Sequence, residues 1–251
     1  MENREQTLFR RVLHFHFRAP PRRPGGPGPG GDRMKIRYLG HAAFELSLES
    51  GARIIFDPYT SGAFGGGFAY APITGSYDVA VVSHDHDDHC CKGVLALAKK
   101  IINKSGSVLV DGASIKSVES FHDDAKGSKR GENLVTVVEA EGIRVAHLGD
   151  LGHAITAKQY PLLKGVDVLM IPVGGHFTID AGVAAKIVKE FAPKITIPMH
   201  FKTPKVDFPI APVENFTKLV DNVERTGVSE IVVTKATLPS RPKVVVLESA
   251  N

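Results

Sequence analysis

The chain has 251 residues, 43% hydrophobic and 23% charged, a balance typical of a soluble globular protein. No apolar run approaches the roughly 18 residues of a transmembrane helix, and no secretory signal is recognisable, so we expect no membrane partner. The net charge of +4 lies entirely in residues 1–33, and the 24 basic and 24 acidic residues that follow cancel, which argues against nucleic acid as a partner.

The only two cysteines are adjacent, Cys90 and Cys91. Adjacent cysteines rarely pair with each other, so no disulfide framework is implied and a reducing cytoplasm is the expected compartment. Two interpretations of the pair are open. The thiols could act as soft metal ligands or redox groups, but we favour their packing as small hydrophobic side chains at the start of a following helix.

Residues 20–31 read PPRRPGGPGPGG, in which ten of twelve residues are Pro or Gly. Such a segment favours neither helix nor strand. The basic, apolar stretch 8–17 could form a surface helix, but a disordered tail is the simpler interpretation. We therefore predict a disordered basic N-terminal tail over residues 1–33 and one folded domain over residues 34–251.

From Met34 onward, strand and helix signals alternate. The strand signals fall on the following stretches: 34–39, 42–48, 53–58, 77–83, 107–110, 118–121, 134–139, 143–148, 166–173, 194–199, 230–234 and 243–248. Helical spacing predicts helices over 92–102, near 156–163, from Asp180 to Phe191 and near 212–225. Strand-rich early and late parts with interleaved helices indicate an α/β (α+β) fold of two packed sheets with helices outside.

The stretch SHDHDDH, residues 83–89, directly follows a strand of buried type. His84 and His86 alternate by two and can converge on one metal ion, whereas Asp88 and His89 can turn toward a second. Imidazole and carboxylate are ligands that zinc, manganese and iron accept. A solvated polar loop is the alternative, but so many ionisable groups beside an apolar strand favour a metal site.

Further candidate ligands follow other predicted strands. His122, Asp150 and His200 each stand at the end of an apolar run. Any one of them could instead be a hydrogen-bonded histidine or a helix-capping aspartate. Together they are the ligands that a site collected along one edge of a sheet requires.

At these residues the chain resembles the metallo-β-lactamase superfamily, and within it the lactonase-like metal-dependent hydrolases. The matching stretches are YLGHAAFEL (38–46), IIFDPY (54–59), VVSHDHDDH (81–89), FHDD (121–124), VAHLGDLGH (145–153), VLMIPVGGHFTID (168–180) and ITIPMHF (195–201). They span nearly all of residues 34–201, and the combination is much more specific than the HxHxDH pattern alone.

The resemblance implies a four-layer αββα sandwich with a dinuclear metal site at one edge of its two sheets. It implies that His84, His86 and His122 hold the first metal ion and that Asp88, His89 and His200 hold the second. Asp150 would bridge the two ions. A hydroxide shared by two ions would be the nucleophile, and Asp88 could also orient it. Asp88 and Asp150 are therefore the expected catalytic residues.

Residues around this centre have less certain roles. His41, His176 and Lys202 are candidates for substrate binding, and His41 could instead contact a metal ligand. Asp57 is expected to hold the metal loop by hydrogen bonds, His147 to be structural, and His153 either to reach the site or to stay outside it.

Two loops could contact the substrate. Residues 59–76, with Tyr59, Phe64, Phe68 and Tyr70, suit either a mobile flap or a surface loop packed on its own aromatic rings. Residues 123–133 bring Lys126, Lys129 and Arg130 near His122. With Lys202 they could attract a phosphate or carboxylate, although charged runs are usually solvated.

The expected function is metal-dependent hydrolysis of a small ester, lactone or phosphoester bond. The cofactors would be two divalent metal ions, Zn²⁺ first, with Mn²⁺ or Fe²⁺ able to use the same ligands. The expected partner is a small-molecule substrate, an anionic one included, and a homo-oligomer is compatible with the sequence. The alternatives are a nucleic-acid phosphodiesterase of the RNA-processing branch and a non-catalytic metal-binding scaffold.

Overall fold

A computed structural model describes residues 33–251. The predicted tail over residues 1–33 lies, except for Arg33, outside the described residues. Arg33 itself already belongs to the first strand. Among the described residues, no helix has both the length and the apolar character needed to cross a membrane.

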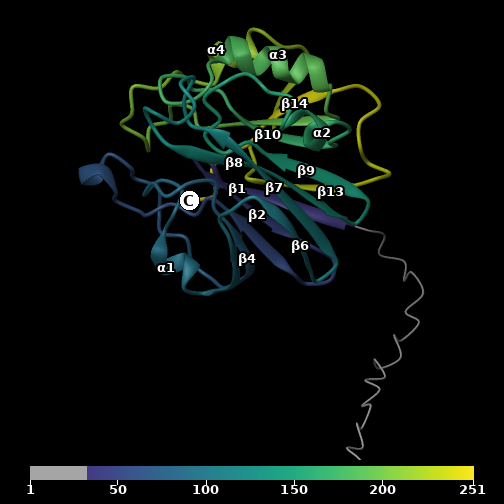
Figure 1. Ribbon diagram of the computed structural model, residues 1–251. Helices are drawn as coiled ribbons and strands as arrows, with labels where there is room; N and C mark the ends of the chain where they lie inside the picture. The colour runs from purple at the N-terminus through teal and green to yellow at the C-terminus, as the bar shows by residue number, and fades with distance from the viewer. Residues whose placement is uncertain (1–32) are drawn as a thin grey trace, which may run out of the picture. The chain divides into compact units, whose positions relative to one another are not determined.

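Two mixed sheets form the body of the domain (Figure 1). The six-stranded sheet has the order β13-β1-β2-β3-β4-β5. Its strands are β1 (Arg33–Gly40), β2 (Ala43–Ser47), β3 (Arg53–Phe56), β4 (Tyr77–Val81), β5 (Ala98–Ile102) and β13 (Glu230–Thr234). The strands β1, β2, β3 and β13 pair antiparallel, whereas β3, β4 and β5 run parallel.

The eight-stranded sheet has the order β12-β14-β11-β10-β9-β8-β7-β6. Its strands are β6 (Gly106–Val110), β7 (Ala113–Phe121), β8 (Glu132–Ala140), β9 (Ile143–His147), β10 (Val168–Pro172), β11 (Ile195–Met199), β12 (Val223–Arg225) and β14 (Lys243–Val246). The run from β9 through β10 and β11 to β14 and β12 is parallel, so the carboxyl ends of β9, β10 and β11 meet at one edge.

The main core lies between the two sheets. Along β1 the side chains alternate between exposed and buried, so that Met34, Ile36 and Tyr38 point into it, as the period of two requires. The strands β10 and β11 are buried along their whole length because helices cover the other face of the eight-stranded sheet.

Figure 1 shows α2, α3 and α4 over the outer face of the eight-stranded sheet and α1 at the far side of the molecule. The short elements are α1 (Lys92–Leu95), α2 (Tyr160–Leu163), α4 (Glu214–Thr217) and the 3₁₀ turn η1 (Phe64–Gly66). The longest helix, α3 (Ala181–Phe191), begins as predicted after Asp180, whose side chain accepts a hydrogen bond from Val183 N–H (2.8 Å). The predicted αββα sandwich is confirmed, with one of its outer helical layers reduced to α1.

Two predicted helices are wrong. The helix expected over 92–102 ends at Leu95, and residues 98–102 form β5, which pairs parallel with β4. The helix expected near 212–225 ends at Thr217, and residues 223–225 form β12. In both cases the apolar spacing fits a helix, but pairing with a neighbouring strand decides the structure.

Candidate metal centre

The candidate ligands come together at one edge of the sandwich, from both sheets. The loop 83–89 follows β4 of the six-stranded sheet. The other three candidates come from the eight-stranded sheet: His122 follows β7, Asp150 follows β9 and His200 follows β11. All seven lie at strand ends, as the sequence predicted.

Asp150 lies at the centre of this cluster. Its Oδ2 atom is 3.1 Å from His200 Nε2, 3.2 Å from His122 Nε2, 3.3 Å from His89 Nε2 and 4.0 Å from His84 Nε2. Its Oδ1 atom is buried and has no hydrogen-bond partner within residues 33–251. One carboxylate thus faces imidazoles that come from three separate segments of the chain.

The donor atoms fall into groups small enough to hold a metal ion. One group is His84, His86 and His122, and another is His41, Asp88, His89 and His200; within each group the donor atoms lie within 4.8 Å of one another. A third group, His84, His89 and Asp150, overlaps both. These groups match the two predicted ligand sets, with His41 added to the second.

Hydrogen bonds to Asp57, direct from His89 and through Ser83 for His84, fix which ring nitrogen of each imidazole carries the proton. Asp57 accepts hydrogen bonds from Ser83 N–H (2.7 Å), Ser83 Oγ–H (2.6 Å) and His89 Nδ1–H (2.8 Å). Because the Ser83 hydroxyl donates its only hydrogen to Asp57, it accepts from His84 Nδ1–H (2.9 Å). With the proton on Nδ1, the neutral form of each ring keeps an Nε2 lone pair facing the cluster, the arrangement a metal ligand needs. This agrees with the predicted supporting role of Asp57.

The local charges also favour a cation. Burial lowers the pKa of His84 to about 3, which leaves a neutral imidazole at pH 7. Burial alone would lower the pKa of His89 too, but Asp150, Asp88 and Asp57 surround it and raise its pKa well above the usual value. Burial would raise the pKa of Asp150, yet the His200 and His89 imidazoles hold it well below the usual range. Ionised carboxylates therefore surround these imidazoles.

Several buried nitrogens have no hydrogen-bond partner in the described part of the chain. They are His41 Nδ1, His84 Nε2, His89 Nε2, His122 Nδ1 and His200 Nδ1. Buried polar atoms without a partner are costly, and a divalent cation would satisfy several at once. The residues present therefore fit a metal ion, although their coordination of one stays a prediction.

Buried polar residues hold the ligands in place. Asn133 Oδ1 accepts from Asp150 N–H (2.9 Å), and its Nδ2 donates to Ser120 Oγ and Leu148 O. Sequence reasoning missed Asn133, although an asparagine directly before the apolar run 134–138 is a signal that could have found it. Asp123 was also missed, and its side chain accepts four backbone N–H groups of the loop 125–130.

His41, Asp57 and His200 all have backbone φ angles in the left-handed region, between 43° and 55°. Such angles cost on the order of 1–3 kcal/mol for residues other than glycine and persist only where the surroundings enforce them. Backbone hydrogen bonds supply that support, from Asp57 N–H to Val81 O and from His200 N–H to His41 O, each 2.9 Å long.

A cavity of about 500 Å³ opens over the cluster. Its lining includes five candidate ligands and the non-ligand residues Phe64, Asp85, Asp87, Arg130, Phe177 and Phe208. Of the four aromatic residues predicted for the loop 59–76, only Phe64 lines this cavity. Tyr59, Phe68 and Tyr70 are buried, with at most 1% of each side chain exposed, so most of this loop packs on its own rings.

The structure places none of the three tentative substrate-binding residues in the lining of this cavity. His41 is fully buried and lies behind Asp88, 3.2 Å from Asp88 Oδ2 through its Nε2. His176 is exposed and lines a neighbouring cavity. Lys202 Nζ donates to Phe208 O (3.0 Å), which holds it in its own loop.

The remaining predicted residues have structural contacts. His147 is buried, donates from Nε2 to Ala42 O (2.9 Å) and accepts from Gly149 N–H at Nδ1 (3.1 Å). His153 accepts from Phe121 N–H (3.1 Å) and so supports the strand end before His122. Cys90 and Cys91 are free thiols that pack at the start of α1, as the favoured interpretation had it.

Gly152, two residues after Asp150, shows how closely the loop after β9 approaches the main chain at His122 and Asp123. A Cβ atom on Gly152 would lie 2.3 Å from both Asp123 N and His122 C, which are backbone atoms. We expect Gly152→Ala to push His122 away from Asp150 and to lower the thermal unfolding midpoint by about 5 °C, the effect of 1–3 kcal/mol of overpacking. Gly93→Ala is the control, because its Cβ would meet only Cys91 Sγ at 3.9 Å. Equal midpoints for the two variants would contradict the expected overpacking.

Comparison with known proteins identifies the family. A model of the β-lactamase superfamily domain matches residues 35–200. The chain belongs to the metallo-β-lactamase superfamily. Within it, the chain is 30% identical to a UPF0173 metal-dependent hydrolase of Thermofilum pendens, over 77% of this chain and 94% of that protein. It is 32% identical to a relative of the same description from Pyrococcus furiosus, over 74% and 92% of the two chains.

Solved structures of similar proteins agree with this family assignment and with the fold. A provisionally assigned zinc-dependent hydrolase of the metallo-β-lactamase superfamily from Thermotoga maritima has 38% identity and a TM-score of 0.69, over 86% of this chain and 98% of that one. Igni18, a metallo hydrolase from Ignicoccus hospitalis, has 21% identity and a TM-score of 0.62, over 87% and 97% of the two chains, and shows the fold alone. The chain is thus a metal-dependent hydrolase with a His/Asp cluster suited to metal binding.

Proposed function

We propose that this metallo-β-lactamase superfamily member hydrolyses a small ester, lactone or phosphoester with two divalent metal ions held at adjoining sites. One observation carries the proposal: Asp150 Oδ2 lies within 3.3 Å of His122 in one donor group and of His89 and His200 in the other. A carboxylate placed between two groups of donors is suited to bridging two cations, because its negative charge offsets both.

His84, His86 and His122 would hold the first ion, and Asp88, His89 and His200 the second. A pair of bound ions supplies a water of lowered pKa and polarises the substrate's carbonyl or phosphoryl oxygen. Imidazole and carboxylate donors suit zinc, and manganese or iron accept the same set. The zinc-dependent description of the Thermotoga maritima relative supports zinc.

The protein's own groups orient this chemistry. Asp57 fixes the lone pairs of His84 and His89 toward the cluster. His41 contacts Asp88 through a 3.2 Å interaction and thereby fixes the direction of the Asp88 carboxylate, which lines the cavity. Asp88 is thus placed to accept a proton from the attacking water or to orient it, in addition to its role as a ligand.

The cavity of about 500 Å³ supports a small-molecule substrate. The neutral charge balance of residues 34–251 supports a partner other than nucleic acid. The free thiols of Cys90 and Cys91 support a reducing compartment such as the cytoplasm.

Metal analysis and a substrate panel test the proposal together. We expect purified protein loaded with zinc to hold about two equivalents of metal per chain and to hydrolyse at least one of three chromogenic probes: 4-nitrophenyl butyrate, a thiolactone or bis(4-nitrophenyl) phosphate. A chelator should abolish this turnover, and added zinc or manganese should restore it, because the attacking water depends on the ions. A single equivalent in fully active protein would exclude the dinuclear site, and chelator-resistant turnover would exclude the metal mechanism.

A further inference from the structure

Three phenylalanine rings gather beside the metal cavity from separate parts of the chain. Phe64 belongs to η1, Phe177 follows β10 and Phe208 follows β11. The rings of Phe64 and Phe208 are 5.1 Å apart between centroids, and those of Phe177 and Phe208 are 5.8 Å apart, both edge to face. Phe64 is 53% exposed. Aromatic surface left open beside a site of imidazoles and carboxylates can bury an apolar part of a ligand.

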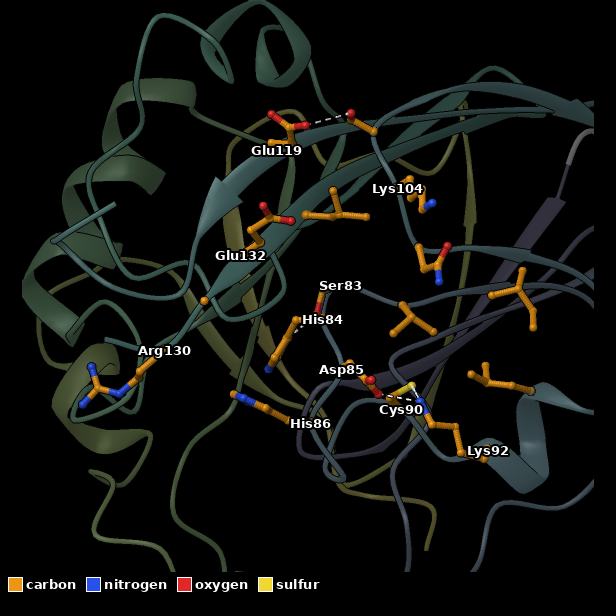
Figure 2. A pocket seen from close by; sticks show the side chains of 17 residues that line it. Ser83, His84, Asp85, His86, Cys90, Lys92, Lys104, Glu119, Arg130 and Glu132 are labelled. Carbon is orange, nitrogen blue, oxygen red and sulfur yellow. Dashed lines mark hydrogen bonds and ion pairs between the residues drawn. The ribbon is translucent and has the colours of Figure 1, made fainter. Parts of the chain in front are cut away.

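Arg130 is the cationic side chain in the same lining. Its guanidinium carbon lies 5.5 Å from the centroid of the Phe177 ring. Across residues 33–251 the guanidinium forms no ion pair, so its donors are available. In Figure 2, which looks into a neighbouring pocket, the guanidinium points away from Cys90 and Lys92.

The other basic residues expected near His122 and His200 are placed differently. Lys129 Nζ is paired with Asp124 (2.8 Å), and neither Lys126 nor Lys202 lines the cavity. The acidic Asp85 of the lining is itself paired with Lys92 (2.5 Å). Asp87 is exposed.

Backbone hydrogen bonds fix the position of the main chain at Arg130. Asp123 Oδ2 accepts from Arg130 N–H (2.8 Å) and Lys129 N–H (2.9 Å), while Oδ1 accepts from Ala125 and Gly127 N–H. Gly131 O then accepts from His122 N–H (3.1 Å). Hydrogen bonds therefore join the loop that carries Arg130 to Asp123 and to the candidate metal ligand His122. These bonds keep the main chain of Arg130 at a fixed distance from His122.

We propose that this cavity selects substrates that carry, beside the bond to be cleaved, an apolar group and an adjacent oxyanion, a carboxylate or phosphate. The proposal rests on the function proposed above. The apolar group would lie on Phe64, Phe177 and Phe208, and the oxyanion would accept two parallel hydrogen bonds from Arg130. The planar guanidinium fork suits oxyanions. The reacting bond would then lie over the ligand cluster in the same cavity.

Binding of a matched pair of probes tests this inference without turnover. The probes are 4-phenylbutyrate and its amide, 4-phenylbutanamide, which has the same shape and no charge. We expect the zinc-loaded full-length protein to bind the carboxylate about tenfold more tightly than the amide in titration calorimetry, in line with a hydrogen bond to a charged group. In Arg130→Ala this preference should fall to about twofold or less.

Three further variants separate the possible causes of the preference for the carboxylate probe. Lys129→Ala should keep the tenfold preference, because Lys129 pairs with Asp124 outside the cavity. Arg130→Lys should keep part of it, since lysine supplies the charge without the fork. Phe177→Ala should weaken both probes by a similar factor. An unchanged preference in Arg130→Ala would overturn the proposal and assign the anion to the metal ions, and failure of the native protein to bind either probe would overturn it as well.

Turnover distinguishes this inference from the proposed function. An Arg130-dependent preference in a protein that hydrolyses none of the chromogenic probes would retain the binding inference and reject the proposed hydrolysis. Chelator-sensitive hydrolysis combined with a carboxylate preference that is unchanged in Arg130→Ala would retain the proposed function and reject the inference.

Discussion

Replacing Asp150 by alanine is expected to lower kcat/KM by at least about a thousandfold, equivalent to about 4 kcal/mol of transition-state stabilisation. The expected cause is loss of the carboxylate that faces His89, His122 and His200 at 3.1–3.3 Å. Without it, the two donor groups lose the charge that offsets two neighbouring cations. Elemental analysis should therefore show fewer than two equivalents of metal per chain.

Asp150→Asn provides the isosteric companion to this variant. It keeps the volume and the hydrogen bond from the backbone N–H to Asn133 Oδ1, so a similar loss of rate in both variants points to charge rather than misfolding. Asp124→Ala is the matched control, because Asp124 is exposed and, within residues 33–251, its only ion pair is with Lys129. Native metal content and native rate in Asp150→Asn would remove Asp150 from the mechanism.

Replacing Asp57 by alanine is expected to weaken metal binding by about 10–100-fold, as for other groups that orient ligands. It should also cost about 3–5 kcal/mol of folding stability, because a fully buried carboxylate with three donors is removed. For a domain of this size we expect the thermal midpoint to fall by about 10 °C. Calorimetry and metal competition with a chromogenic chelator measure the two effects.

Asp57→Asn separates the effect of the side-chain charge on stability from the effect of the strained backbone at this position. Asparagine tolerates the φ of 43° at this position, so any loss in this variant comes from the side chain. Burial raises the pKa of Asp57, but the facing His89 outweighs burial and the net shift is downward. This stabilisation is therefore present above the ordinary aspartate pKa of about 3.9 and is lost on further acidification. Equal stability of Asp57→Asn and the native protein from pH 5 to 8 would contradict this account.

The sequence predicted which His and Asp side chains would lie together, because each candidate ligand stands beside a local signal. His84 to His89 form a short motif, and His122, Asp150 and His200 each end an apolar strand. The cavity lining was less predictable. Phe177 and Phe208 lie in different loops and become neighbours only when β10 and β11 align in parallel.

The wrong helix over 92–102 has a physical cause. The apolar positions of 92–102 repeat with a helical period, but β4 offers an open edge to which residues 98–102 pair, and this long-range contact outweighs local preference. His41 was expected to contact either substrate or a metal ligand, and the structure places its buried imidazole 3.2 Å from the candidate ligand Asp88. Sequence position gives the neighbourhood of such a residue but not the direction of its side chain.

The backbone hydrogen bond from His200 to His41 joins the two sheets at the same edge as the donor groups. Because those groups also come from both sheets, a bound ion would act as a cross-link between them, and metal binding and closure of that edge form one linked equilibrium. Each tenfold rise in free metal above the dissociation constant then adds about 1.4 kcal/mol to the resistance of the native state to unfolding. If these groups bind metal as proposed, the metal supply of the surroundings would set part of the working stability of the protein.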